Sequence, residues 1–375
     1  MSARFLTVVL ERAFNMRDGF GREIDYMRIS VIDSCNLNCY YCNPCDNNEH
    51  CHALNILSVK EVLCIVRAAT RLGIKHFRLT GGEPLLHPQL DEMVLQIKKI
   101  PGVSSVSLTT NAVLLAQHAK WLKEAGIDSI NVSLDTIDAS EYERITKKPL
   151  LEEVKHGINA AIECGIRVKI NVVLTPQTDV VALTRYVAKK GTDIRFIEMM
   201  PVGEGHTNGV EPYKKVIGTL SKLYGEPCRI NTEKTKEINS GNDKRKIPDN
   251  GPAEYYIFPE LGIRVGLIQA IHGKFCDTCN RIRVTADGRL MPCLGSSVTM
   301  DLVPDSWDFA DDVEKDFAIV RALRAAIKAK PRCHNFNDNV VTYTKTTETK
   351  TVEPKATELK AAEVNAARNM SRIGG

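Results

Sequence analysis

The sequence predicts an α/β fold in which helices cover a largely parallel sheet. Short apolar runs typical of buried strands alternate with helical patterns from Tyr26 to Met200. Glycines follow four of the helical patterns, where helices commonly end. Six successive strand–helix units imply a parallel sheet with helices on its outer face. This pattern allows a closed barrel, a partial barrel or a doubly wound sheet.

The alternating elements follow one another without long gaps. The expected strands cover 26–32, 76–80, 104–109, 129–134, 166–173 and 193–199. The helices between them cover 58–72, 89–99, 116–125, 152–164 and 180–190. The first helix carries an N-terminal signal, because Ser58 and Glu61 are spaced to cap it reciprocally. The glycines that end helices are Gly73, Gly126, Gly165 and Gly191.

The pattern changes after Pro201. One more helix is expected over 211–224, and the polar, turn-rich stretch 231–252 predicts an exposed loop. Short antiparallel strands are expected at 255–258, 263–268, 281–285 and 289–292, with Asp287-Gly288 as a hairpin turn. A helix is expected over 316–330. Residues 342–367 are rich in Thr, Lys, Glu and Ala without apolar periodicity, which predicts a flexible linker.

Composition narrows the class of protein. The 375 residues, 43% of them hydrophobic, suffice for one large domain with an appendage. No apolar run reaches the length of a membrane span, and the N-terminus lacks the features of a signal peptide. Twelve cysteines without an export signal indicate a reducing compartment and metal binding. These features predict a cytoplasmic protein that does not bind a membrane, and a net charge of only +4 does not suggest a nucleic-acid-binding surface.

Three cysteines lie on the loop after the first strand. Cys35, Cys39 and Cys42 have the spacing C-x3-C-x2-C. Clustered thiolates bind soft metals or iron–sulfur clusters, and structural zinc usually takes four protein ligands. Three thiolates on a four-iron cluster leave one iron open to a small molecule. A zinc loop is the alternative interpretation.

Polar residues stand at the ends of the next strands. The second strand is followed by Gly81-Gly82-Glu83-Pro84, in which paired glycines would let a ligand approach the backbone. Thr109-Thr110-Asn111 and the stretch 131–135 end the third and fourth strands. Each could simply cap a helix. With the cysteine loop after the first strand, four successive strand ends carry polar residues, which favours a ligand site at this edge of the sheet.

A second cysteine set appears late in the chain. Cys276, Cys279 and Cys293 have the spacing C-x2-C-x13-C. A zinc site completed by His272 or His334 is the alternative. Between these cysteines, Arg281 and Arg283 flank Ile282, so both guanidinium groups point to one side of a strand and suit phosphate oxygens. A solvated basic strand would have the same pattern.

The order of these motifs, with a terminal Gly-Gly, resembles the GTP 3′,8-cyclases of molybdenum cofactor biosynthesis, a family of radical S-adenosylmethionine (SAM) enzymes. The resemblance covers about residues 22–340 and the last eight residues. It implies a partial TIM-type radical SAM barrel with a C-terminal antiparallel extension that carries a second iron–sulfur cluster. The implied divisions are a lead-in (1–25), the barrel (26–225), the auxiliary-cluster and GTP region (226–341), the linker (342–367) and a tail (368–375).

The resemblance also implies roles for single residues. Cys35, Cys39 and Cys42 would hold a SAM-binding [4Fe-4S] cluster, and Cys276, Cys279 and Cys293 a second [4Fe-4S] cluster that meets the guanine. Tyr41, Gly82, Ser133 and Met200 would contact SAM. The GTP site would comprise Arg28, Arg78, Thr109, Lys169, Arg281, Ile282 and Arg283. The catalytic set would be Arg281, Arg283, Gly374 and Gly375, with the terminal glycines entering the active site.

The implied reaction is the SAM-dependent cyclisation of GTP to (8S)-3′,8-cyclo-7,8-dihydroguanosine 5′-triphosphate. The implied partners are an electron donor of flavodoxin or ferredoxin type, the downstream cyclic pyranopterin monophosphate synthase (MoaC) and a second copy in a homodimer. A radical SAM peptide-modifying enzyme and a zinc-stabilised binding module are the rival interpretations.

Two stretches depart from the family pattern. Asn43-Pro44 stands where the family commonly has Met-Pro, and the linker lengthens the region before the terminal glycines. The loop after Pro44 adds four residues that could bind a third metal, although a variable surface loop is the favoured interpretation. These residues are Cys45, His50, Cys51 and His52.

Overall fold

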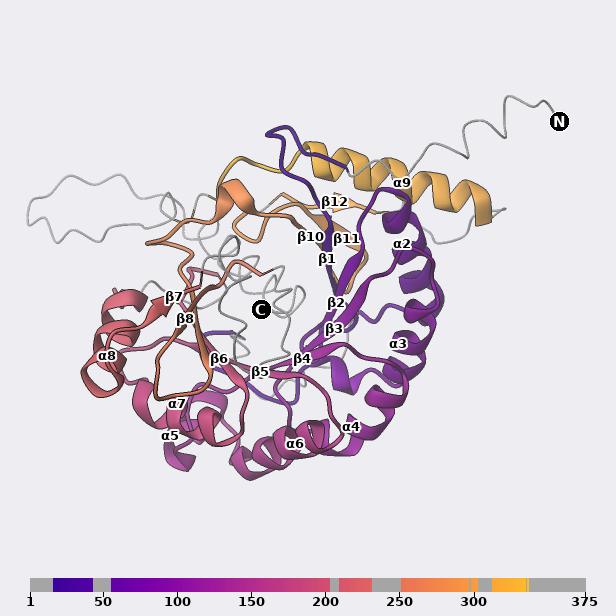
Figure 1. The fold of residues 1–375 in the computed structure, drawn as a ribbon. Coiled ribbons are helices and arrows are strands. Elements are labelled where there is room, and N and C mark those ends of the chain that lie inside the picture. Colours follow the sequence, from indigo (N-terminus) through magenta and orange to yellow (C-terminus); the bar gives the residue numbers. More distant parts are fainter. Residues whose placement is uncertain are drawn as a thin grey trace, which may run out of the picture.

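The computed structural model describes residues 16–42, 55–202, 209–230, 251–296, 298–302, 312–334 and 336. Within these residues one sheet of twelve strands curves around a central space, and helices cover its outer face (Figure 1). The strand order is β12-β11-β10-β1-β2-β3-β4-β5-β6-β9-β8-β7. Because β12 and β7 are the two edges of this sheet, the barrel is incomplete. The structure thus confirms a partial barrel and excludes a doubly wound sheet.

The barrel elements lie close to their expected positions. Its parallel strands are β1 (Tyr26–Ser30), β2 (His76–Thr80), β3 (Ser105–Thr110), β4 (Ser129–Ser133), β5 (Val168–Val173) and β6 (Asp193–Ile197). The expected helices are α2 (Val59–Arg71), α3 (Leu90–Lys98), α4 (Leu115–Glu124), α6 (Leu151–Glu163) and α7 (Val180–Lys189). The capping box of Ser58 and Glu61 is present, and the four helix-ending glycines have positive φ. The helix α5 (Ala139–Thr146) was not expected.

The C-terminal part extends the sheet at both edges. It contains η2 (Tyr213–Ile217), α8 (Gly218–Tyr224), β7 (Cys228–Arg229), β8 (Glu254–Ile257), β9 (Arg264–Ile268), η3 (Cys276–Thr278), β10 (Arg281–Val284), β11 (Arg289–Met291), β12 (Met300–Asp301) and α9 (Asp312–Lys328). The antiparallel hairpins β8–β9 and β10–β11 are confirmed. β9 and β10 also pair in parallel with β6 and β1, which the sequence did not predict.

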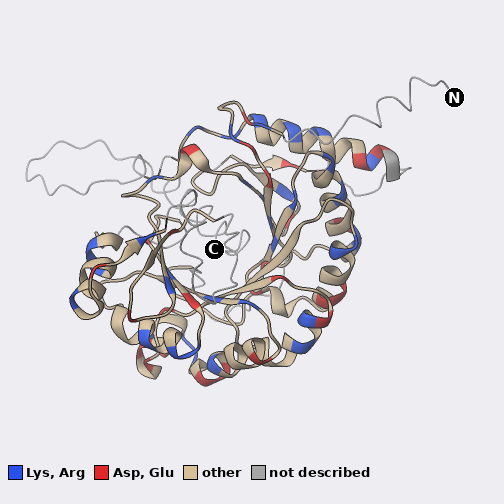
Figure 2. Cartoon of the chain, in the orientation of Figure 1, with Lys and Arg blue, Asp and Glu red and all other residues tan. Residues whose placement is uncertain are grey.

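The inner and outer faces of the barrel differ in chemistry. Met27, Ile29, Phe77 and Leu79 are fully buried in the core between the sheet and the helices. The residues that alternate with them face the barrel interior, and Arg28 is among them. TIM-type barrels usually fill this space with branched apolar side chains. Here Lys and Arg lie on strands of both walls (Figure 2), which indicates a space for a charged ligand.

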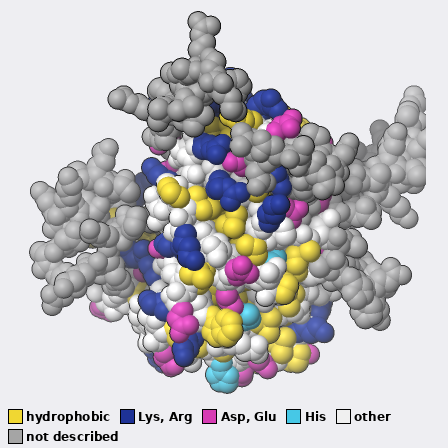
Figure 3. Space-filling view, turned by 90° about the vertical axis from the view of Figure 1, so that its right-hand side faces the viewer, with side chains coloured by type: hydrophobic (Ala, Val, Ile, Leu, Met, Phe, Trp, Pro, Cys, Tyr) yellow, Lys and Arg dark blue, Asp and Glu magenta, His cyan; other side chains and the backbone are white. Residues whose placement is uncertain are grey.

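The outer surface has the mixed character of an exposed protein face. Figure 3 views the side on which α2 and α3 lie, and basic, acidic and hydrophobic side chains alternate there. None of the helices in the described ranges is long and apolar enough to cross a bilayer.

Candidate active site

The first cysteine loop leaves the carboxyl end of β1 and is anchored at several points. Backbone N–H groups of Asn38 and Tyr40 donate to the carbonyls of Thr146 and Ile145, 3.0 and 3.1 Å away at the end of α5. The N–H of Cys42 donates to the carbonyl of Cys39 at 2.9 Å. The short helix that sequence reasoning missed therefore holds the cysteines in place.

The paired glycines bring the end of β2 against this loop. The N–H of Gly82 donates to Ile32 O, and that of Glu83 to Ser34 O, each at 2.7 Å. A Cβ atom at Gly82 would lie 2.2 Å from Ser34 O, and one at Gly81 would lie 2.5 Å from Ile32 O. The expectation that these glycines leave their backbone free for a ligand is therefore wrong for the N–H of Gly82. Both glycines are needed for close backbone packing.

We predict that Gly82→Ala lowers the unfolding free energy of the apoprotein by about 1–3 kcal/mol, because the new methyl group meets backbone that cannot move aside. Gly218→Ala is the matched control, since a Cβ there meets nothing within 4 Å. The control should be neutral or slightly stabilising. Urea unfolding monitored by circular dichroism measures the unfolding free energy of both variants. Equal stability of the two variants would contradict the packing role.

Two carboxyl groups, buried Glu83 and partly buried Asp135, fix the surroundings of the first cysteines. Glu83 accepts hydrogen bonds from Thr110 Oγ1 at 2.6 Å, Asn111 N at 2.7 Å and Leu85 N at 3.0 Å. Asp135 accepts from Tyr41 Oη at 2.5 Å and from Val173 N at 2.7 Å. Burial raises the pKa of Glu83 to about 7 and that of Asp135 to about 6. Tyr41 is thus oriented by a partner that the sequence did not reveal.

The other residues expected to contact SAM lie at the same edge of the sheet. Ser133 is the last residue of β4, and Gly82 and Met200 follow the ends of β2 and β6. The strands are parallel, so their carboxyl ends meet at the rim where the cysteine loop begins. The structure therefore brings these positions to one end of the barrel.

A row of three arginines crosses the inner wall. The register pairs Arg28 with Arg283 on one side and with Arg78 on the other. Neighbouring strands are about 4.8 Å apart, so these guanidinium groups are close neighbours. Burial, followed by repulsion from Arg283, holds the pKa of Arg28 well below its usual range. Burial and the neighbouring Arg281 likewise lower the pKa of Arg283.

Within the described residues, two members of the row, Arg78 and Arg283, form no ion pair. Arg78 donates through Nε to the hydroxyl of Tyr26 and through Nη1 to Thr109 Oγ1 at 3.3 Å. Burial acts to raise the pKa of Tyr26, but Arg78 and the other arginines lower it overall. The Nε atom of Arg283 is buried and has no hydrogen-bond partner among the described residues. Buried cations need an anionic partner, so this wall fits a polyanion such as a triphosphate.

The opposite wall continues the polar lining. Thr109, Asn131 and Lys169 occupy one row across β3, β4 and β5. Arg195 on β6, which sequence reasoning missed, donates through Nε to Asn171 Oδ1 at 2.9 Å. The sequence pattern could have identified Arg195 as an inward-facing residue, because it alternates with buried Ile194 and Phe196. Arg28 alternates with Met27 and Ile29 in the same way.

The second cysteine set lies at the other end of the same strands. Cys276 and Cys279 precede β10, and Cys293 follows β11. The start of β10 pairs with the start of β1, whereas Cys35 follows the end of β1. Five residues of strand span about 17 Å. The arginine row therefore lies between the two cysteine sets.

Two buried cations hold the second set in place. Arg22 donates to the carbonyl of Cys276 at 2.7 Å and to those of Pro331 and Arg332 at 2.6 and 2.8 Å. Lys330 Nζ donates to the carbonyls of Arg281 and Pro292, both at 2.8 Å. Sequence reasoning missed Arg22 and Lys330, because their partners are distant in the chain and belong to no local motif.

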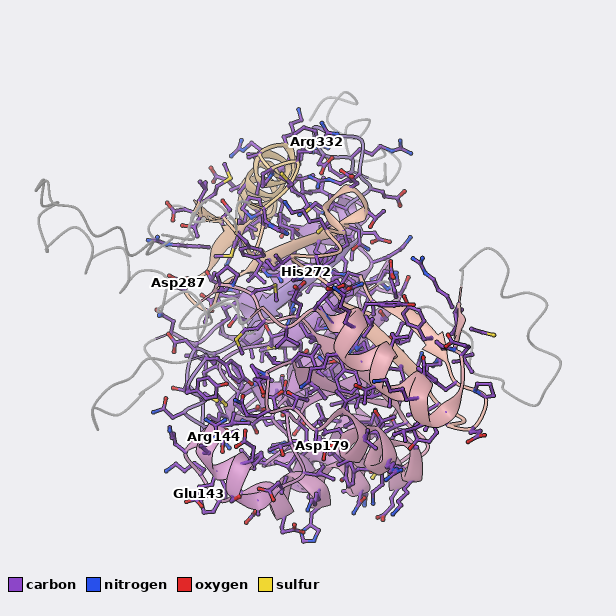
Figure 4. The ribbon with its side chains drawn as sticks, turned by 90° about the vertical axis from the view of Figure 1, so that its left-hand side faces the viewer. Glu143, Arg144, Asp179, His272, Asp287 and Arg332 are labelled. Carbon is purple, nitrogen blue, oxygen red and sulfur yellow. The ribbon has the colours of Figure 1, made fainter. Side chains whose placement is uncertain are left out.

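The two histidines weighed as zinc ligands are engaged elsewhere. His272 Nδ1 contacts the carboxylate of Glu198, whose other oxygen accepts from Ile271 N at 2.7 Å. His272 lies well away from Asp287 in Figure 4. His334 Nε2 pairs with Ala270 O at 2.8 Å. These contacts give the ring positions a structural explanation that does not involve zinc.

Both donor sets suit iron–sulfur clusters, whose usual ligand is cysteine sulfur. In the first set, burial and nearby Glu83 raise the pKa of Cys35 to about 12, and burial and Asp135 raise that of Cys42 to about 11. Such thiols become thiolates when a positive metal centre binds them. In the second set, burial acts to raise the pKa of Cys279, but Lys330 and Arg281 outweigh it.

Several expected features lie outside the described residues. They are the loop residues Cys45, His50, Cys51 and His52, the linker 342–367 and the terminal Gly374 and Gly375. Their expected roles remain predictions, as does the division of the chain into five ranges.

Comparisons with known proteins agree with this arrangement. Residues 29–182 match the Radical SAM superfamily, and residues 192–336 match Molybdenum Cofactor Synthesis C. A GTP 3′,8-cyclase of Clostridium perfringens (strain SM101 / Type A) is 35% identical over 324 residues, which are 86% of this chain and 95% of the relative. One from Peptoclostridium acidaminophilum is 37% identical over 328 residues, with 86% and 94% covered.

Solved structures share the fold at low identity. Streptococcus suis SuiB superimposes with a TM-score of 0.53 at 15% identity, covering 80% of this chain and 65% of SuiB. SuiB bound to the precursor peptide SuiA gives a TM-score of 0.53 at 14% identity, with 86% and 70% covered. This likeness concerns the fold alone. From its relatives and its two matched domains, the chain belongs to the GTP 3′,8-cyclase family of radical SAM enzymes.

Proposed function

We propose that this protein converts GTP to (8S)-3′,8-cyclo-7,8-dihydroguanosine 5′-triphosphate, the first step of molybdenum cofactor biosynthesis. The observation that carries the proposal is the row of Arg283, Arg28 and Arg78 on the inner wall, in which Arg283 is buried and the other two are partly buried, between two three-cysteine sets. A triphosphate would neutralise this row. A nucleotide on this wall would extend toward both ends of the barrel, within reach of both metal centres.

Each group of site residues has its own role in the proposed reaction. Cys35, Cys39 and Cys42 hold a SAM-binding [4Fe-4S] cluster, and Cys276, Cys279 and Cys293 hold a second one. When bound, the first cluster and SAM supply a 5′-deoxyadenosyl radical. Tyr41, Gly82, Ser133 and Met200 orient SAM at the rim of the barrel.

The substrate is held by the inner wall. Thr109 and Lys169 bind the nucleotide beside the arginine row, and the arginines fix its phosphates so that the ribose meets the carboxyl ends of the strands. Arg281, Ile282 and Arg283 join this site to the second cysteine set. The buried walls keep water from the reaction. The terminal Gly374 and Gly375 complete the catalytic set.

We further propose the cellular setting that such an enzyme needs. A flavodoxin- or ferredoxin-type protein supplies electrons, and the cyclic pyranopterin monophosphate synthase (MoaC) consumes the product. The enzyme works in the cytoplasm, where its thiols stay reduced. We also propose that two copies of this protein form a homodimer.

Anaerobic incubation with SAM, dithionite and GTP tests the function. We expect mass analysis to show 5′-deoxyadenosine together with a product that has the mass of GTP and a bond between C3′ and C8. GTP labelled with deuterium at C3′ should transfer its label to 5′-deoxyadenosine. Unchanged GTP under conditions that reconstitute both clusters would overturn the proposal, and modification of a peptide instead would favour the rival enzyme class.

A further inference from the structure

Helix α9 carries a cationic face that the site described above does not use. Arg321, Arg324 and Lys328 are exposed, and their spacing of three and four residues places them on one side of the helix. Arg332 is exposed four residues further on, just beyond the helix end. In Figure 2 the Lys and Arg bands recur along α9, with acidic residues confined to its N-terminal part.

These cations are not neutralised by the described part of the chain. Within it, none of Arg321, Arg324 and Lys328 forms an ion pair, while Asp316 on the same helix pairs with Arg71 at 2.8 Å. Glu314 is the exposed acid at the start of this face. The side chain of Phe317, 39% exposed, adds an apolar contact next to the charges.

The cationic face leads directly to the second cysteine set. One guanidinium, that of Arg22, bonds the carbonyl of Arg332 at 2.8 Å and that of Cys276 at 2.7 Å. In Figure 4 Arg332 lies beside the end of α9, far from Glu143 and Arg144.

We infer that this face, Arg321, Arg324, Lys328 and Arg332, docks an acidic one-electron carrier that reduces the centre held by Cys276, Cys279 and Cys293. The inference rests on the proposed function. Cyclisation only isomerises GTP, but each turnover takes up two electrons and one proton. One electron cleaves the sulfonium of SAM, and one electron with the proton is added to the nucleotide after ring closure.

An acidic redox protein fits this face better than other anions. A carrier that docks here would be oxidised by one electron, and Cys276, Cys279 and Cys293 would hold the centre that accepts this electron. Charge complementarity of this kind speeds encounter and fixes orientation. The four cations would also attract nucleic acid. However, the face adjoins the second cysteine set, and docking of an electron carrier explains that position whereas binding of nucleic acid does not.

The test compares two triple variants with equal charge changes. Arg321→Glu, Arg324→Glu and Lys328→Glu are combined in one. The control combines Lys120→Glu, Lys189→Glu and Lys222→Glu, which are exposed on α4, α7 and α8 and, within the described residues, form no ion pair. The probe is a purified flavodoxin, with cytochrome c as a cationic carrier.

We expect the α9 variant to lose flavodoxin affinity about 10- to 100-fold in calorimetry at low ionic strength, while the control and the wild type bind alike. Stopped-flow oxidation of reduced flavodoxin should slow in parallel, and 0.5 M salt should remove the difference. Cytochrome c should bind none of the three proteins. If the α9 variant unfolds, the corresponding triple Gln variant takes its place.

Dithionite distinguishes a failure of the docking inference from a failure of the proposed function, because this small reductant needs no docking surface. The α9 variant should keep full cyclase activity with dithionite. Equal flavodoxin binding by both triple variants would overturn the docking inference and leave the proposed function standing. Binding of heparin without binding of flavodoxin would also overturn it. Absence of product from the wild type with dithionite would overturn the proposed function itself.

Discussion

Cys39→Ser is expected to abolish SAM cleavage and to retain about half of the bound iron, because two independent four-iron clusters are expected. Cys279→Ser should retain the other half, cleave SAM without coupling and make no cyclised nucleotide. The physical reason is the separation of the two sets, which follow the end of β1 and precede the start of β10. Iron and sulfide analysis after anaerobic purification gives the first readout, and chromatography of 5′-deoxyadenosine gives the second.

Cys228→Ser is the matched control, since Cys228 is exposed on β7, away from both sets. It should keep both clusters and full activity. Loss of all iron in either Cys39→Ser or Cys279→Ser would show that the two sets share one cluster. Four irons lost from the control would show that iron content follows general damage and does not identify ligands.

Much of the barrel was predictable because local chemistry fixes it. Ser58 and Glu61 cap α2 through contacts three residues apart, and the helix-ending glycines act on their own turns. The helix α5 was missed because its eight residues are mostly polar and its apolar stripe is short. Its role in holding the cysteine loop depends on tertiary contacts.

The unpredicted parts of the site depend on contacts between distant segments. The parallel pairing of β10 with β1 joins residues that are 255 positions apart, such as Tyr26 and Arg281. No local sequence pattern predicts this pairing, so the arginine row could not be predicted from sequence alone. Arg22 reaches Cys276 across 254 residues. The close packing of Gly82 against the backbone of Ser34 was also not predictable, because it depends on how the end of β2 meets the cysteine loop. Motif order located the site, but strand register determines its geometry.

Arg283→Ala is expected to weaken GTP binding about 10- to 100-fold, because a charge-assisted hydrogen bond to phosphate contributes about 1.5–3 kcal/mol. SAM affinity should not change. In the absence of GTP the variant should be as stable as the wild type or more stable. The reason is that Arg283 is buried beside Arg28, and burial together with neighbouring arginines lowers the pKa of both.

Two thermal melts of the apoprotein, with and without GTP, measure both effects. The wild type should gain stability with GTP, and Arg283→Ala should start at an equal or higher Tm but gain less. Arg289→Ala is the matched control, because Arg289 lies on the adjoining strand β11 with its side chain 53% exposed. It should leave GTP binding unchanged. A lower Tm of Arg283→Ala without GTP, combined with unaltered GTP affinity, would make Arg283 a structural residue. A substrate-binding role requires the opposite pattern, in which the site is less stable when empty because it is built to surround a polyanion.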